Sequence, residues 1–135
     1  LAFIITGVNE SILYMTDTGY VSQKNRKYLN NLDYYIIESN HDVEMLMATK
    51  RPYFLKQRIH GDLGHLNNEY SAKMMVELIG DKTKEIVLAH LSEEANTKEK
   101  ALETYRKIFN QNNLEFDNIK VASQIDVVSG GNYED

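Results

Sequence analysis

The stretch Tyr34-Tyr35-Ile36-Ile37-Glu38-Ser39-Asn40-His41-Asp42 decides the fold class. Its first four residues form a continuous apolar run, which predicts a short strand buried on both faces of a parallel sheet. Polar and titratable side chains follow that run at once. A buried strand that ends in such a cluster is typical of α/β proteins, in which ligands bind beyond the carboxyl ends of the strands.

Two other predicted strands end in the same way. The strand 11–16 leads into Asp17-Thr18-Gly19, and the strand 85–89 leads into His90-Leu91-Ser92-Glu93-Glu94. Carboxylate and imidazole groups are ligands of zinc and manganese in hydrolytic sites. The three strand ends together therefore predict a metal site or a proton-transfer site at one edge of the sheet.

Each of these side chains is also compatible with a purely structural role. Asp17 is equally compatible with a turn residue, and a lone histidine such as His90 more often makes a structural hydrogen bond. Glu38 could cap the helix that follows it, and His65 could lie at the surface. His60 has the weakest case, because no strand precedes it. Since no HxH or HExxH signature is present, only the combination of strand ends favours a metal site.

The rest of the chain alternates between extended and helical patterns. Strands are predicted at 1–6, 11–16, 34–37, 85–89, 119–122 and 125–128, and helices at 23–32, 43–48, from Arg51-Pro52 onward, at 67–79 and at 97–111. This order predicts one layered α/β domain over residues 1–128 with at least one parallel crossover. Residues 129–135 are predicted to form a flexible tail.

Composition narrows the class of protein. A chain of 135 residues with 42% hydrophobic and 26% charged residues is typical of a globular domain. The net charge of −5 disfavours a broad surface for polyanions, although a local basic patch is still compatible with it. The absence of cysteine excludes disulfides and zinc-thiolate sites and is consistent with a cytoplasmic location. No apolar run approaches the ~20 residues of a membrane span.

One segment is locally basic. Four cations interleave with two aromatic residues: Lys50, Arg51, Tyr53, Phe54, Lys56 and Arg58. Basic side chains beside aromatic rings suit a nucleic-acid strand, with its phosphates and stacking bases. A solvated amphipathic helix accounts for the same composition and is the more common case.

The strand-end motifs also resemble a known family. The segments 14–19, 36–42, 64–69 and 88–96 are similar to the C-terminal half of metallo-β-lactamase-fold hydrolases, in particular to the YycJ/WalJ group of bacterial double-strand DNA exonucleases. The resemblance covers residues 1 to about 128. Asn67 stands where the group usually has serine, and it can still cap a helix. The fold implied is the C-terminal half of an αββα sandwich.

The resemblance implies roles for four residues. Asp17 would bridge two divalent ions, zinc or manganese, and His90 would be a ligand of the second ion. His65 would protonate the leaving oxygen, as in the relatives that trim the 3′ ends of tRNA precursors, and Glu38 would orient His65. The chemistry is consistent with this assignment, because an alkoxide leaving group needs a proton and imidazole titrates near neutral pH.

The remaining implied contacts are with the substrate. Asn40 and His41 would touch the substrate or support the residues that do. Four basic side chains would contact the DNA backbone: Lys50, Arg51, Lys56 and Arg58.

The sequence lacks the HxHxDH motif that supplies most metal ligands in this family. Because it also begins within an apolar run without methionine, we expect a fragment whose partner is the N-terminal half of the same protein. That half would bind most of the metal, and the fragment alone would be inactive. The whole protein would be a dinuclear metal-dependent phosphodiesterase, a DNA exonuclease. The alternatives are a hydrolase of RNA, a thioester or a lactam on the same fold, and a non-catalytic interaction module.

Overall fold

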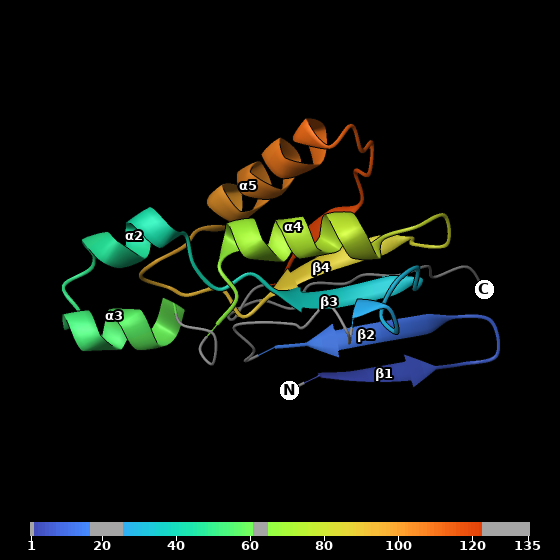
Figure 1. Ribbon diagram of the computed structural model, residues 1–135, viewed down its shortest axis with the longest axis horizontal. Helices are drawn as coiled ribbons and strands as arrows, with labels where there is room; N and C mark the ends of the chain where they lie inside the picture. The colour runs from blue at the N-terminus through green and yellow to red at the C-terminus, as the bar shows by residue number, and fades with distance from the viewer. Residues whose placement is uncertain (1, 17–25, 61–64, 123–135) are drawn as a thin grey trace.

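The computed structural model describes residues 2–16, 26–60 and 65–122, which form one mixed sheet and the helices packed around it (Figure 1). The strands are β1 (Ala2–Thr6), β2 (Ser11–Met15), β3 (Tyr34–Glu38), β4 (Glu85–Ala89) and β5 (Ile119–Val121). The helices are α2 (Val43–Ala48), α3 (Tyr53–His60), α4 (Asn68–Leu78) and α5 (Lys98–Gln111). These elements confirm the predicted α/β class.

Some predicted segments extend beyond this description. The predicted helix 23–32 lies partly outside the described residues, and its described part, residues 26–32, consists mainly of turns. The predicted strand 125–128 and the predicted tail 129–135 lie wholly outside them. Asp17 also lies outside them, two residues beyond the end of β2.

The sheet brings the carboxyl ends of its parallel strands to one edge. Its strand order is β1-β2-β3-β4-β5, in which β1 and β2 pair as an antiparallel hairpin and the other neighbours pair in parallel. Figure 1 shows α2 and α3 beyond the carboxyl ends of β2, β3 and β4. Polar side chains that follow these strands therefore gather between the sheet and the two short helices.

The hydrophobic core lies between the sheet and the pair α4 and α5, which cover the same face (Figure 1). Tyr105 and Phe109 of α5 are buried against it, and burial raises the pKa of Tyr105. Asn67 caps α4 by accepting a hydrogen bond from the backbone N–H of Tyr70 at 2.8 Å, and Thr97 caps α5. The expected capping role of Asn67 is thus confirmed.

The burial of β3 differs from the prediction. Tyr35 and Ile37 are fully buried, whereas Tyr34 and Ile36, on the opposite face, are only half-buried. The difference arises because α4 and α5 pack on one face only. No helix in the described part of the chain is long and apolar enough to cross a lipid bilayer.

The opposite edge of the sheet, at the amino ends of the parallel strands, has a structural role. Asp33 accepts a hydrogen bond from the backbone N–H of Ser11 at 2.9 Å, which lowers the pKa of this carboxyl group. Lys82 and Lys84 lie near the same carboxylate and add to the effect. This contact joins the start of β2 to the residue that precedes β3.

Candidate metal and proton-transfer centre

A buried carboxylate between two imidazole rings forms the centre of the candidate site. Glu38, the last residue of β3, is fully buried. Its Oε1 atom lies 2.8 Å from Nδ1 of His65 and 2.5 Å from Nδ1 of His90, and its Oε2 accepts the backbone N–H of Leu66 at 2.9 Å. The two ring centroids are 5.2 Å apart.

This arrangement sets the orientation of both rings. An ionised carboxylate only accepts hydrogen bonds, so both Nδ1 atoms carry their hydrogen when they donate to Glu38. The Nε2 atom of each ring is then the nitrogen that does not contact Glu38, and it is the atom through which the ring could bind a metal ion or a substrate. A carboxylate that holds imidazoles in one tautomer is the usual support of metal-ligating and proton-transferring histidines.

The pairing of neighbouring strands explains why Glu38 lies between the two histidines. In the parallel register of β3 and β4, Glu38 is opposite Ala89, so His90 follows directly beside it. His90 has a φ of 59°, and this left-handed backbone conformation ends β4 sharply. On its other side, the chain beyond β3 pairs with the segment that carries His65, because the backbone N–H of Asn40 donates to the carbonyl of Leu66 at 2.8 Å.

A buried amide network holds the chain just beyond β3. Asn96 donates from Nδ2 to the carbonyl oxygens of Ser39 and Asn40, at 2.9 and 3.1 Å. Its Oδ1 accepts Nδ2 of Asn68 at 2.8 Å and the backbone N–H of Thr97 at 2.9 Å. Ser39 in turn donates its hydroxyl to Oδ1 of Asn68 at 2.6 Å. The network therefore ties β3 to the starts of α4 and α5.

We expect Asn96→Ala to destabilise the protein by about 2–3 kcal/mol, because it leaves several buried polar groups without partners. Urea unfolding of the purified protein measures the loss. Asn110→Ala, on the exposed surface of α5, is the control and is expected to change stability by less than about 0.5 kcal/mol. An equally small effect of Asn96→Ala would contradict the structural role of the network.

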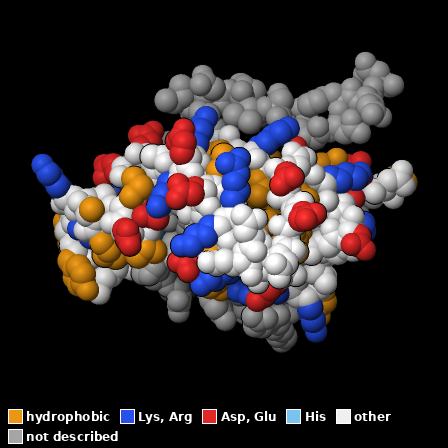
Figure 2. Space-filling view, turned by 90° about the horizontal axis from the view of Figure 1, so that it is seen from above, with side chains coloured by type: hydrophobic (Ala, Val, Ile, Leu, Met, Phe, Trp, Pro, Cys, Tyr) orange, Lys and Arg blue, Asp and Glu red, His pale blue; other side chains and the backbone are white. Residues whose placement is uncertain are grey.

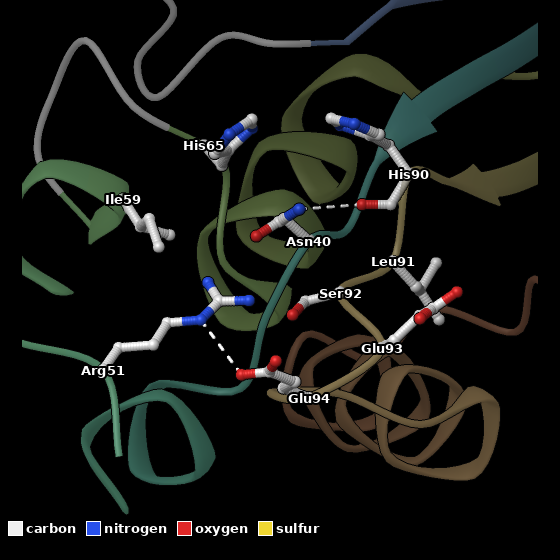
Figure 3. A pocket seen from close by; sticks show the side chains of 9 residues that line it. All are labelled: Asn40, Arg51, Ile59, His65, His90, Leu91, Ser92, Glu93 and Glu94. Atoms are coloured by element: carbon white, nitrogen blue, oxygen red, sulfur yellow. Dashed lines mark hydrogen bonds and ion pairs between the residues drawn. The ribbon is translucent and has the colours of Figure 1, made fainter. Parts of the chain in front are cut away.

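Both histidines open onto a cavity of about 280 Å³ (Figure 3). Arg51 reaches into it from the segment before α3 and pairs with Glu94 at 3.1 Å. Asn40 donates from Nδ2 to the carbonyl oxygen of His90 at 2.9 Å, which fixes the histidine loop against the chain beyond β3. The side chains of His65 and His90 are 27% and 42% exposed, so a solute in the cavity can reach them.

The three candidate ligand groups at the site suit a divalent cation that binds both nitrogen and oxygen. Glu38, His65 and His90 place one ligand atom each within 4.8 Å of one another. Two imidazole nitrogens and a carboxylate oxygen are suitable ligands for zinc and manganese. The three side chains could thus hold a metal ion together, or Glu38 could support histidines that bind it through Nε2.

Comparison with known proteins adds an independent observation. No family profile matches the chain. Over 93 residues, or 69% of the chain, it is 50% identical to the exodeoxyribonuclease WalJ of Streptococcus pneumoniae, in strains D39 and R6. Over the same length it is 45% identical to the exodeoxyribonuclease YycJ of Bacillus anthracis. The 93 matched residues are homologous to part of the WalJ and YycJ proteins. This confirms the resemblance inferred from the strand-end motifs.

The match covers only part of each WalJ or YycJ protein. It spans 35% of the length of each of these relatives. The structure shows an α/β unit with a mixed five-stranded sheet.

The structure brings together three of the four residues to which the WalJ/YycJ resemblance implies a catalytic or metal-binding role. Glu38 contacts His65, as the resemblance implies, and it also contacts His90. Asn40 lines the cavity. His41 is fully buried, with Nδ1 3.1 Å from Oδ1 of Asn40.

The four basic residues are distributed unevenly around this cavity. Arg51 lines it, whereas Lys50 and Arg58 are exposed outside it. Lys56 donates from Nζ to the carbonyl of Met47 at 2.7 Å and thereby links α3 to α2.

Sequence reasoning missed the amide network and the second contact of Glu38. Ser39, Asn68 and Asn96 are far apart in the chain, and no spacing rule connects them. The contact between Glu38 and His90 could have been found from the parallel register, since both residues end adjacent parallel strands.

Proposed function

We propose that this chain forms part of a metal-dependent nuclease that hydrolyses phosphodiester bonds in DNA, as an exonuclease. The observation that carries the proposal is the buried Glu38 between two cavity-facing imidazoles, at the carboxyl edge of the sheet. The relatives that share half of the matched residues are named exodeoxyribonucleases. The substrate class follows from that name, and the acid–base chemistry follows from the geometry.

Glu38 supports both histidines in this proposal. Its two oxygens already accept three N–H groups, and it is fully buried. A metal ion bound through Nε2 of His90 would leave all three of these contacts in place, so that Glu38 supports the ligand. We therefore assign His90 as a metal ligand, and the family resemblance implies Asp17 as a second one. When bound, a divalent ion supplies Lewis acidity and a hydroxide nucleophile at neutral pH.

His65 supplies the proton for the leaving group. Protonated His65 keeps Nδ1–H on Glu38, and the carboxylate stabilises the imidazolium. As the P–O bond breaks, the ester oxygen takes the proton from Nε2, and His65 becomes the neutral Nδ1–H form. No rotation of the ring is needed, because Glu38 holds it in the same orientation throughout.

Arg51 is placed to bind a phosphate of the substrate. Its guanidinium lies in the same cavity as the two histidines and pairs with Glu94, whose side chain is 61% exposed. An exposed ion pair of this kind contributes little to stability, so a phosphate can compete for Arg51. Lys50, Lys56 and Arg58 would extend the cationic surface along the DNA.

The remaining part of the fold would cover the second face of the sheet. Ile12, Tyr14, Ile36 and Val87 form a half-buried apolar surface on the face opposite α4 and α5. Together with the 35% coverage of the relatives, this supports a partner layer from the same protein, as in an αββα metallo-β-lactamase sandwich. That layer would carry the other ligands of a dinuclear centre.

The test is hydrolysis of linear duplex DNA by the full-length protein from the reading frame that contains this chain. We expect cleavage with manganese or zinc, a loss of at least about 100-fold with a chelator, and recovery when the metal is restored. RNA, thioester and lactam substrates are compared in parallel. Activity that persists without metal, or that favours one of these other substrates, would contradict the proposal. The isolated chain is expected to be inactive.

A further inference from the structure

The outer surface of α3 presents two aromatic rings to solvent. Tyr53 and Phe54 are 69% and 71% exposed, which is unusual for side chains of their size. Gln57 and Arg58 follow one turn later on the same exposed side of the helix. We call these four residues the α3 outer face.

The inner side of the same helix is attached to the candidate site. Ile59 lines the cavity with His65, and its carbonyl accepts the backbone N–H of His65 at 2.8 Å. Arg51, two residues before α3, lines the cavity as well. The helix that carries the α3 outer face therefore borders the cavity through its other side.

The segment of sequence that contains the rings is basic. Residues 45–60 contain four basic side chains and no acidic one, although the whole chain has a net charge of −5. Figure 2 shows hydrophobic side chains gathered at the left end of the molecule, the end formed by α2 and α3 in Figure 1. Charge complementarity thus favours a polyanionic occupant for this surface.

The chemistry of the α3 outer face favours unpaired nucleotides. Aromatic rings stack on bases irrespective of sequence, and nearby guanidinium groups bind the phosphates between them. The stacked bases of an intact duplex do not offer their faces to a protein, except at the end of the helix. A strand whose phosphodiester lies in the cavity would pass the rim at α3.

We propose that the α3 outer face stacks on unpaired bases of the strand held in the cavity, so that the site binds ends that are single-stranded or frayed. This inference rests on the proposed nuclease function and specifies that the bound end of the substrate is single-stranded or frayed. The α3 outer face is a binding surface and takes no part in the chemical step.

The experiment measures binding to labelled oligonucleotides by fluorescence anisotropy, with the full-length protein and a chelator to prevent cleavage. The probes are a blunt duplex, the same duplex with a four-nucleotide unpaired end, and that end with abasic sites. We expect the unpaired end to bind at least about 10-fold more tightly than the other two probes. We expect Tyr53→Ala/Phe54→Ala to remove that preference.

Matched variants separate stacking from a general effect of apolar surface or of lost aromatic rings elsewhere. Tyr28 is 66% exposed and lies in the turn before β3, so Tyr28→Ala is expected to leave the preference unchanged. Tyr53→Phe/Phe54→Tyr is expected to keep it, and Tyr53→Leu/Phe54→Leu to lose it. A leucine variant that binds like the wild type would contradict stacking. Conversion of a dimer to a monomer by the alanine variant would instead identify a second copy of the chain as the occupant.

Hydrolysis of bis(p-nitrophenyl) phosphate distinguishes the two proposals. If the wild type hydrolyses this small diester and DNA but binds all three probes equally, only the stacking inference is overturned. If it hydrolyses neither but still prefers the unpaired end, the nuclease function fails and the binding surface stands. The alanine variant is expected to hydrolyse the small diester at the wild-type rate.

Discussion

Glu38→Gln is expected to lower the turnover of the full-length protein on DNA by at least about 100-fold. The substitution preserves the shape of the side chain but replaces one acceptor oxygen by an NH₂ group, which is a donor. Glu38 receives three N–H groups, two from histidines at Oε1 and one from Leu66 at Oε2. In either orientation of the amide, its NH₂ group therefore faces an N–H donor.

Two measurements make this prediction specific. Metal affinity should fall together with turnover, because His90 loses the support of its tautomer. Glu85→Gln is the matched control, since Glu85 is also buried but lies at the opposite end of β4 and pairs with Lys120 at 3.1 Å. Turnover and metal affinity within about threefold of the wild type for Glu38→Gln would overturn the central role of this carboxylate.

His65→Ala is expected to lower turnover on DNA by about 10²- to 10⁴-fold, the usual contribution of a general acid. The loss should depend on the leaving group. The alkoxide released from DNA needs a proton, whereas p-nitrophenolate leaves without one, so hydrolysis of bis(p-nitrophenyl) phosphate should fall much less. Metal affinity should change little.

His90→Ala is the comparison variant. Its turnover on both substrates should fall by the same factor, and its metal affinity should fall as well. Comparison of turnover on the two diesters, with metal titrations, measures the difference. An equal loss on both substrates for His65→Ala would mean that His65 binds metal as His90 does. That result would favour the direct ligation of one ion by all three side chains.

Much of the fold could be predicted from local patterns. The strand predicted from the apolar run 34–37 and the helix cap expected at Asn67 each depend on close neighbours in sequence, and the structure confirms both. The half-burial of Tyr34 and Ile36 could not be predicted, because it depends on which face the helices cover.

Those residues of the candidate site that lie at the ends of strands could be predicted from the sequence. Glu38 and His90 end adjacent strands, so a parallel sheet brings them together. His65 follows no strand, and its contact with Glu38 depends on backbone hydrogen bonds between distant segments. The contact of Asn96 with Ser39 spans 57 residues, and no local propensity encodes it.

The backbone conformation of His90 lowers local stability but places an imidazole where the proposed chemistry needs one. A φ of 59° disfavours a histidine by about 1 kcal/mol relative to glycine, which adopts this conformation without steric cost. Screening for heat resistance alone would therefore favour glycine at this position and select against the imidazole. A protein that keeps His90 therefore has a less stable loop at the end of β4 but retains the imidazole, so a search for heat-resistant variants has to hold this position fixed.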